Sequence, residues 1–385
     1  MHDALVVGMG PAGASAAAEL ARAGLSVLGL EWKAMPRYKV CGGALSARMD
    51  KILEPDYHGV VEDTIHRVRF QFAGAETFEI SSPEPMAYMV MRDRFDAYLC
   101  GKALEAGAEV RENERVVKVR ECTDRVEVET ERERYWAKVV VGADGANSVV
   151  ARALFAGRRG TMLGALEGEV PWSGASSCLA AGTIVLDLGV VKGGYGWVFP
   201  KERRLSVGVA GLQGRHRNPR SAYQGFVRAE PALGGLEVPD GLGHPIPLYG
   251  GKVAEQHPLT TSRSLLVGDA AHLVDLVLGE GIYYAVLSGR LAARTTVDYL
   301  KMLTPDLRAY DAQVVKEFYS EFRTAARMAW TLYTFPRLAH EALRRRPDIL
   351  HLYADILKGR ETYQSFYANA RARAKESFAQ LLGSP

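Results

Sequence analysis

The sequence predicts an α/β protein in which a discontinuous nucleotide-binding domain carries an inserted antiparallel β-sheet and is followed by a helical C-terminal region. Three observations predict this fold class. A strand, glycine loop and helix occupy the first residues, a second glycine-rich turn follows a buried strand far along the chain, and short alternating strands lie between them. At 385 residues with 48% hydrophobic content, the chain can bury two cores.

The first element is a buried parallel strand over residues 4–7, which a glycine loop joins to an alanine-rich helix. Gly8, Gly10 and Gly13 form a GxGxxG pattern in that loop. Gly8 permits the sharp turn, Gly10 lets a pyrophosphate approach the backbone, and Gly13 lets helix and strand pack closely. The next strand, residues 25–30, ends at Glu31, which can accept a pair of ribose hydroxyls. These features predict a dinucleotide site.

A second cofactor-binding turn is predicted within residues 265–289. A buried strand over residues 265–267 delivers Gly268 and Asp269 to a tight turn, and Gly279 with Gly281 opens a helix. The helix start offers free N–H groups and a positive dipole end, and the Asp269 carboxylate can accept from ribityl hydroxyls. A bound flavin is the simplest physical explanation of this turn.

The middle of the chain alternates between two predicted domains. Residues 88–99 lead from a strand into a helix, and Arg92 at the junction is placed to meet a cofactor phosphate or the isoalloxazine edge. The remaining predicted strands are a hairpin or small sheet over 110–119 and 126–136, a buried strand over 138–148 that ends in Asp144 and Gly145, and an antiparallel sheet over 164–211. We expect the flavin domain over 1–60, 91–160 and 256–300, the substrate domain over 61–90 and 161–255, and the helical region over 301–385.

Charge and cysteine usage narrow the class of protein. The net charge of +3 is too small to indicate nucleic-acid binding. Residues 301–385 hold 14 Lys and Arg against 9 Asp and Glu. This basic, aromatic-containing region could make a peripheral membrane contact, and a solvated basic face over a buried aromatic stripe explains it equally. The four cysteines, Cys41, Cys100, Cys122 and Cys178, show no zinc or CxxC pattern, so we expect reduced thiols and no metal site.

No segment has the pattern of a signal peptide or membrane span. The most apolar stretch, residues 4–18, is broken by Pro11 and by glycines, and it carries the dinucleotide pattern. We therefore expect a cytoplasmic protein.

Together these motifs resemble the para-hydroxybenzoate hydroxylase class of flavoproteins. Two further motifs make the chain similar to the geranylgeranyl reductase family within that class. PRYKVCGGALS, residues 36–46, is similar to the family's cysteine-glycine-glycine loop, and YGWVFP, residues 195–200, is similar to its YxWxFP signature. The resemblance covers residues 1 to about 300 and implies a Rossmann-like FAD-binding domain with noncovalent FAD.

The resemblance also implies which residues contact FAD. Besides Gly8 and Gly10 of the glycine loop, they are Ala12, Gly13, Glu31, Cys41, Gly42, Ala44, Arg92, Val116 (through its backbone, near adenine), Asp269, Gly281 and Ile282. One departure stands before the Gly-Glu-Gly of residues 279–281. The family commonly has Asn-Pro-Leu-Thr there, and this chain has Asp275, Leu276, Val277 and Leu278.

Three residues are candidates for the chemistry. The Cys41 thiol, beside two glycines on a flavin-facing loop, could relay a proton or tune the flavin, and inert packing is the alternative. Tyr195 and Trp197 point to one face of a strand, and Phe199 continues the row. This row predicts one wall of a long apolar tunnel, with an ordinary sheet core as the alternative.

The implied activity is saturation of isolated C=C bonds in a polyprenyl chain of the geranylgeranyl type. Hydride comes from reduced flavin, and the proton from Cys41, Tyr195 or an ordered water. The alternatives are a flavin-dependent monooxygenase or halogenase acting on an aromatic substrate, and a flavoprotein quinone reductase. No second GxGxxG follows a strand, so the electron donor could be NAD(P)H or a ferredoxin. The substrate could be a prenyl lipid or a diphosphate.

Overall fold

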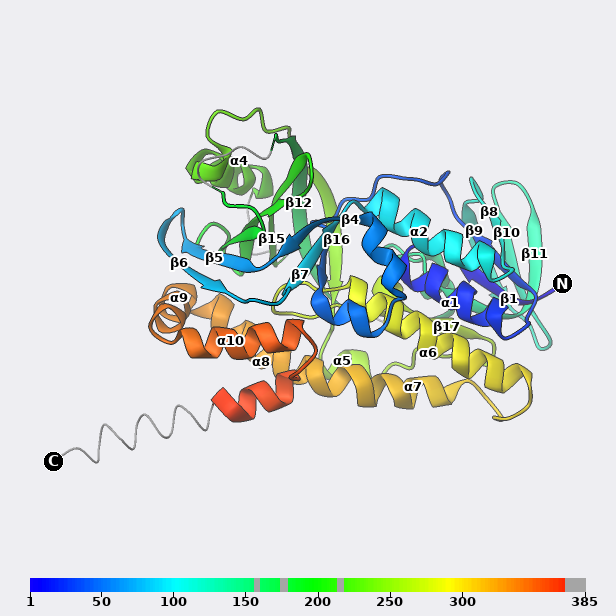
Figure 1. Cartoon of the computed structure of the whole chain (residues 1–385). Coiled ribbons are helices and arrows are strands. Elements are labelled where there is room, and N and C mark those ends of the chain that lie inside the picture. The colour runs from blue at the N-terminus through cyan, green and yellow to red at the C-terminus, as the bar shows by residue number, and fades with distance from the viewer. Residues whose placement is uncertain (156–159, 174–178, 213–217, 371–385) are drawn as a thin grey trace.

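The computed structural model describes residues 1–155, 160–173, 179–212 and 218–370. Two large sheets form the centre of the molecule, with helices around them (Figure 1). Cys178 lies outside the described residues, and Cys41, Cys100 and Cys122 are free thiols. Within the described part of the chain, no helix is both long enough and apolar enough to cross a membrane.

The first sheet belongs to the nucleotide-binding domain. Its strands run in the order β8-β2-β1-β11-β10-β9, with β17 paired to β11. The bounds are β1 (His2–Val7), β2 (Val27–Leu30), β8 (Glu109–Arg111), β9 (Val116–Glu121), β10 (Val126–Thr130), β11 (Arg134–Gly142) and β17 (Ser264–Leu266). The pairs β1–β2, β1–β11, β2–β8 and β11–β17 are parallel, and β9, β10 and β11 form an antiparallel extension. This sheet confirms the predicted Rossmann-like architecture, because the N-terminal strand and β17, which are far apart in the sequence, lie in it on either side of β11.

Two strand predictions were wrong. Residues 126–136 are not one strand, because β10 ends at Thr130 and the antiparallel β11 begins at Arg134. Residues 110–119 are not one strand: β8 ends at Arg111 and lies parallel to β2, whereas β9 begins at Val116 and pairs with β10. Asn113 between them adopts a left-handed φ of 58°, which interrupts an extended strand. The strand over residues 138–148 is also shorter than expected, because the Asp144 carboxylate caps the start of α3 (Val149–Leu154), accepting from Val149 N at 2.5 Å.

The glycine pattern produces the predicted close packing. Gly8 has φ 91°, and a Cβ there would lie 2.6 Å from the Ala143 carbonyl oxygen. A Cβ on Gly13 would lie 1.8 Å from the Gly8 carbonyl oxygen, so only glycine lets α1 (Pro11–Arg22) approach β1 this closely. α6 (Ile282–Leu300) then packs on α1, and a Cβ on Gly289 would lie 2.2 Å from the Ala12 carbonyl oxygen.

The second sheet has the strand order β16-β12-β15-β14-β13-β5-β6. Its strands are β5 (Arg67–Phe72), β6 (Ala75–Ser81), β12 (Thr161–Pro171), β13 (Thr183–Asp187), β14 (Gly194–Pro200), β15 (Arg204–Leu212) and β16 (Leu242–Leu248). All neighbouring pairs are antiparallel except β5–β13, which is parallel. A small third sheet links the two large ones, and its strands are β3 (Ala44–Ser46), β4 (Val61–Ile65) and β7 (Ala87–Val90).

Shorter helical elements connect the sheets. They are η1 (Ala47–Lys51), η2 (Pro55–Val60), α2 (Arg92–Glu105), α4 (Pro219–Ala229), η3 (Pro231–Leu233), α5 (Lys252–Glu255) and η4 (Gly268–Ala271). α2 lies against α1 on the first sheet, and α4 packs on β12 and β15 of the second (Figure 1).

The predicted helical C-terminal region is present. It consists of α7 (Arg308–Val314), the π-helical η5 (Val315–Tyr319), α8 (Ser320–Thr334), α9 (Pro336–Arg345) and α10 (Pro347–Leu357). Proline occupies the first position of α9 and of α10, where its missing N–H costs nothing. Tyr333 and Tyr353 pack inward, as the buried-stripe interpretation expects, and Arg344 and Arg346 form ion pairs with Glu341 and Asp348.

Candidate active site

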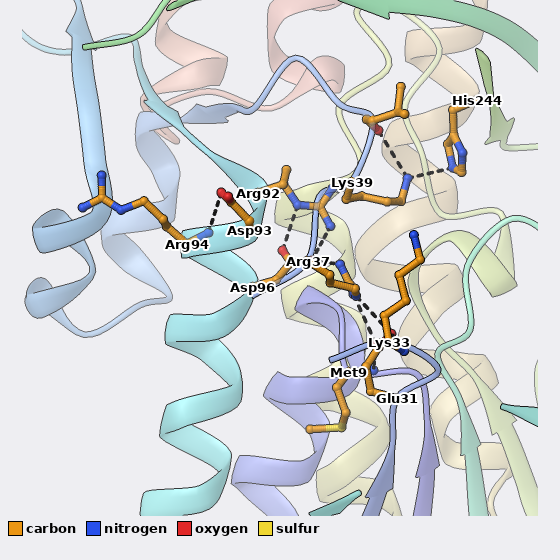
Figure 2. A network of polar contacts seen from close by, with 11 residues as sticks. Met9, Glu31, Lys33, Arg37, Lys39, Arg92, Asp93, Arg94, Asp96 and His244 are labelled. Atoms are coloured by element: carbon orange, nitrogen blue, oxygen red, sulfur yellow. Dashed lines mark hydrogen bonds and ion pairs between the residues drawn. The ribbon is translucent and has the colours of Figure 1, made fainter. Parts of the chain in front are cut away.

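A buried ladder of charges lies beside the glycine loop (Figure 2). Glu31, 1% exposed, accepts from Met9 N at 3.0 Å and pairs with Arg37 Nε at 3.0 Å. Arg37 Nη1 also donates to Asp96 Oδ2 at 2.9 Å, and Asp96 accepts from Arg92 Nε and Nη2 at 2.8 Å. Two carboxylates and two guanidinium groups therefore neutralise one another where the sequence places the dinucleotide. Arg37 was missed in the sequence, because nothing local marks it as the partner of Glu31.

The surroundings of Gly10, next to Arg37 and Asp96, suit the pyrophosphate of a dinucleotide. A Cβ added to Gly10 would meet only Arg37 Nη2 at 3.7 Å and Asp96 Oδ2 at 4.0 Å. Gly10 is also the N-cap of α1, and no side chain caps that helix start. Free N–H groups, the positive helix end and a nearby guanidinium together suit two phosphate groups.

The second half of the cofactor site lies where α6 begins. Gly281 is the N-cap of α6 without a side-chain cap, and a Cβ on it would lie 3.5 Å from Asp269 Oδ1. Ile282 is the first residue of the helix. The two halves meet directly, because a Cβ on Gly268 would lie 3.0 Å from the Ala12 Cβ. The residues present therefore fit FAD at both ends of the site.

Val116 lies apart from this junction. It begins β9, close to Glu114, whose N–H donates to the Glu31 carbonyl at 2.9 Å. This position is near the ribose end of the predicted site and away from the Cys41 loop.

The cysteine-glycine-glycine loop packs closely against the row of aromatic side chains on β14. A Cβ on Gly42 would lie 2.9 Å from the Phe199 ring and 3.4 Å from Trp197 Nε1. Gly43 has φ 75°, and its N–H donates to Cys41 Sγ at 3.4 Å, before the chain enters β3 at Ala44. Both glycines are needed for the loop to approach the sheet this closely.

The Cys41 thiol also interacts with Arg92. Burial alone would lower the pKa of the Arg92 guanidinium, but its interactions with Asp96 and Cys41 outweigh burial and raise it. Arg92 is therefore a permanent positive charge next to Cys41, and it links the thiol to the charge ladder.

Tyr195, Trp197 and Phe199 form the predicted aromatic row on β14. Their exposed fractions are 7%, 5% and 9%, and the centroids of neighbouring rings lie 5.9 and 6.1 Å apart. The Tyr195 hydroxyl donates to the Leu278 carbonyl, and burial raises the pKa of Tyr195 above its ordinary value. The structure thus brings together the Cys41 loop, the aromatic row and residues 275–281 on one face of the second sheet.

The same sheet face carries charged residues that sequence reasoning missed. On β15, Gly208 pairs with Trp197 on one side and with Glu167 of β12 on the other. Ser206 likewise pairs with Phe199 and with Glu169. Directly paired residues point to the same side of a sheet, so Glu167 and Glu169 continue the aromatic row beyond the small residues of β15. The alternation of glutamates in LEGEV, within a strand of buried residues, was the signal that could have found them.

Glu167 is held by two hydrogen-bond donors. It is 1% exposed and accepts from the Tyr38 hydroxyl at 2.8 Å and from Ser206 Oγ at 3.2 Å. Trp197 Nε1 donates in turn to Ser206 Oγ at 3.2 Å. Burial, reinforced by Glu169, raises the pKa of Glu167 to about 7. Glu169 forms an ion pair with Lys201, which is 1% exposed.

A neutral histidine and a lysine stand next to this group. Lys39 Nζ donates to His244 Nε2 at 2.7 Å (Figure 2). Burial lowers the pKa of Lys39, with Arg92 adding to the effect. Burial also lowers the pKa of His244 to about 4, helped by the charges of Lys39 and Arg92, so its imidazole is the acceptor at neutral pH.

Asp275 organises the segment in which this chain departs from the family. Its Oδ1 accepts from Val277 N at 2.7 Å and from Leu278 N at 3.1 Å, and its Oδ2 accepts from the Tyr363 hydroxyl at 2.6 Å. Asp275 is fully buried, and burial, with the charge of Glu280, raises its pKa to about 6. The C-terminal region therefore contacts the segment of residues 275–278 through Tyr363.

Known protein families share these features. The FAD binding domain family matches residues 1–171. The chain is 30% identical to a geranylgeranyl diphosphate reductase of Rhodobacter capsulatus, over 95% of this chain and 91% of the relative. It is 31% identical to a digeranylgeranylglycerophospholipid reductase of Methanopyrus kandleri, over 85% of this chain and 89% of the relative.

Solved structures share the fold. A geranylgeranyl bacteriochlorophyll reductase-like protein from Thermoplasma acidophilum has a TM-score of 0.80 at 22% identity, covering 96% of this chain and 98% of its own. A flavin-dependent brominase has a TM-score of 0.76 at 20% identity, covering 97% and 99%. The predicted fold class and the predicted FAD cofactor are thereby confirmed.

Proposed function

The chain belongs to the geranylgeranyl reductase family of FAD-dependent oxidoreductases, and from this premise we propose that it saturates isolated C=C bonds of a polyprenyl chain. The observation that carries the proposal is the aromatic row of Tyr195, Trp197 and Phe199 under the cysteine-glycine-glycine loop. An apolar wall of this kind suits a hydrocarbon chain and excludes water from a reactive carbon centre.

The chemistry divides between cofactor and protein. Bound in its reduced form, FAD supplies hydride. We assign its binding to the residues named from the family resemblance, with Arg37 added beside Glu31. Cys41, which the Gly43 N–H and Arg92 contact, is the proposed proton donor. Tyr195 contributes by holding the Leu278 carbonyl, and its raised pKa keeps the phenol neutral.

The C-terminal helices supply a route to a lipid substrate. Trp330 on α8, Phe335 between the two helices and Leu338 on α9 are 64%, 48% and 71% exposed, beside Arg337. The inner side of α8 carries Leu332, which packs against the core that contains the aromatic row. We propose that this face rests on a membrane surface, where aromatic, aliphatic and cationic side chains are favoured together. Co-sedimentation with anionic phospholipid vesicles tests it, and equal sedimentation of the Trp330→Ser, Leu338→Ser double variant would contradict it.

The function is tested by product analysis. Enzyme reduced chemically under anaerobic conditions is mixed with geranylgeranyl diphosphate, or with a quinone that carries a prenyl tail. The expected product gains two hydrogens for each bond reduced. If no substrate of this panel is saturated, while an aromatic compound in air gains oxygen or halide, the oxygenase alternative replaces the proposal. Rapid quinone reduction without any saturated product would instead favour the quinone reductase. NADPH, NADH and reduced ferredoxin are compared as electron donors in the same assay.

A further inference from the structure

The buried carboxylates next to the aromatic row hold more negative charge than their surroundings neutralise. Glu167 and Glu169 lie two residues apart on one face of β12, and among the described residues Lys201 forms its ion pair with Glu169. Glu169 Oε2 is buried without a hydrogen-bond partner among the described residues. A proton on Glu167 removes the excess charge and can be donated to that oxygen, because two buried carboxylates at close range do not both ionise readily.

The charges around Glu167 explain why it retains a proton near neutral pH. Burial, and then Glu169, raise its pKa to about 7, while Tyr38 and Lys201 act in the opposite direction. The titratable groups that face it come from several elements: Tyr38 from the cysteine loop, Glu169 from its own strand, Lys201 from the end of β14, Tyr223 from α4, and the Lys39–His244 pair beside β16. Glu167 is therefore poised to exchange a proton under physiological conditions.

Tyr38 connects Glu167 to solvent and to the cysteine loop. Its side chain is 41% exposed, and its hydroxyl donates to Glu167 Oε2 at 2.8 Å. Burial and Glu167 raise the pKa of Tyr38. Tyr38 stands three residues before Cys41 on the same loop, so the phenol and the thiol belong to one short segment. On the opposite side, Ser206 Oγ donates to Glu167 Oε1 and is itself held by Trp197. The carboxyl is thus fixed in place by the wall that lines the substrate.

We propose that Glu167 and Tyr38 form a proton-delivery pair that reprotonates the Cys41 thiolate after each double bond is reduced, an inference that rests on the proposed function. Reduction of the alkene by reduced flavin adds a hydride, which carries both electrons, and one proton. That proton leaves the Cys41 thiol as its S–H bond breaks and a C–H bond forms. In one concerted step, Tyr38 gives its hydroxyl proton to the thiolate and takes the proton of Glu167. A proton from bulk solvent, which enters at the exposed edge of Tyr38, then restores the Glu167 carboxyl group. Glu167 acts through other groups and is a positioning and relay residue.

The test compares Glu167→Gln with wild type over successive turnovers. Enzyme is mixed anaerobically with geranylgeranyl diphosphate between pH 5.5 and 9 in excess dithionite, which reduces the flavin again after each bond, and the products with one, two and three bonds saturated are followed with time. We expect wild type to slow above about pH 7. Glu167→Gln should slow reduction at least about ten-fold after the first bond and lose that pH dependence, since a general acid contributes roughly 10²–10⁴ in rate. Glu167→Asp should restore part of the rate.

Matched tyrosine variants separate the relay from packing. Tyr38→Phe should slow the same later bonds. Tyr223→Phe, which removes a hydroxyl bonded to the Pro239 carbonyl at 3.1 Å, should not. A readout without turnover is the infrared absorption of protonated carboxyl groups in the oxidised protein, measured in an Asp275→Asn background because the Asp275 carboxyl also titrates near pH 6. In that background, a band present at pH 6 and lost by pH 8 should be absent once Glu167→Gln is added.

Each outcome bears on one proposal. Unchanged rates and an unchanged pH profile in Glu167→Gln, or a carboxyl band that this variant retains, overturn the relay. Wild-type enzyme that forms no saturated product overturns the proposed function, and the infrared titration still decides whether Glu167 holds the proton. If Glu167→Gln fails to retain FAD, Glu167→Asp and Tyr38→Phe carry the kinetic test.

Discussion

Replacing Asp275 with asparagine should stabilise the protein above pH 6. The native pKa of about 6 lies above the ordinary value of 3.8, so the folded state binds the proton more tightly than the unfolded state does. The protonated form therefore favours folding below pH 3.8, and this contribution is lost as the pH rises through about 6. The separation of the two pKa values corresponds to about 3 kcal/mol. Asparagine cannot ionise and avoids that loss.

The local geometry accommodates the amide. Its oxygen can still accept from the N–H groups of Val277 and Leu278, and its NH₂ faces the Tyr363 hydroxyl, which can rotate to accept. Any fixed cost of this exchange, about 1 kcal/mol, is the same at every pH. The quantity to measure is therefore the change with pH in the difference between the two unfolding free energies.

The assay is urea unfolding of both proteins at pH 4.5, 6 and 8 in the same excess of FAD. The advantage of Asp275→Asn over wild type should grow by about 2 kcal/mol between pH 4.5 and pH 8, most of it by pH 6, because the rest of the roughly 3 kcal/mol is lost below pH 4.5. Tyr363→Phe is the control, and it should lower stability at pH 8, because it removes a donor from the charged carboxylate. Parallel pH profiles of wild type and Asp275→Asn would refute the reasoning.

Three further predictions concern the cofactor and substrate sites. Gly13→Ala should destabilise the apoprotein by about 1–3 kcal/mol or prevent folding, because its Cβ would lie 1.8 Å from a carbonyl oxygen. Gly10→Ala, whose Cβ would have its nearest atom at 3.7 Å, should fold normally and bind FAD weakly. Thermal unfolding and FAD titration measure these effects, and tight FAD binding by Gly10→Ala would contradict the prediction. Cys41→Ser should keep FAD and lose most turnover, since a hydroxyl is a far weaker acid than a thiol. If the reduced variant is oxidised by substrate at the wild-type rate in a single turnover, Cys41 has only a packing role. Trp197→Ala should slow prenyl reduction more than it weakens FAD binding. A larger effect on FAD binding than on the reduction rate would show that Trp197 does not line the substrate site.

The features that the sequence predicted well are local ones. Gly8 and Gly13 could be interpreted correctly because the close packing of a GxGxxG turn is read within a single strand–helix–strand unit. The aromatic row was predicted because alternation along one strand fixes which side chains share a face.

The missed features depend on pairing between distant segments. Glu167 joins the site only because β15 lies between β12 and β14 with Gly208 opposite both Glu167 and Trp197, and nothing in any one of these strands determines that register. Arg37 finds Glu31 and Asp96 only after α2 packs beside α1. The sequence showed Asp275 as part of a departure from the family pattern before residues 279–281. Its partner Tyr363 lies in the part of the chain to which the family resemblance did not extend.

The contact between α1 and α6 has a consequence for how the cofactor exchanges. These two helices begin at the two halves of the FAD site, and a Cβ on Gly289 would already lie 2.2 Å from the Ala12 carbonyl oxygen. Backbones this close move as one rigid body, so the two halves cannot separate by a hinge to release FAD. We expect the exit to open instead at residues 36–43, as a local loop opening that breaks the ion pairs of Arg37 and the hydrogen bonds of Tyr38 and Lys39. Loss of cofactor is then a kinetic property of that loop, and protease cleavage within it should accelerate FAD release without unfolding the domain.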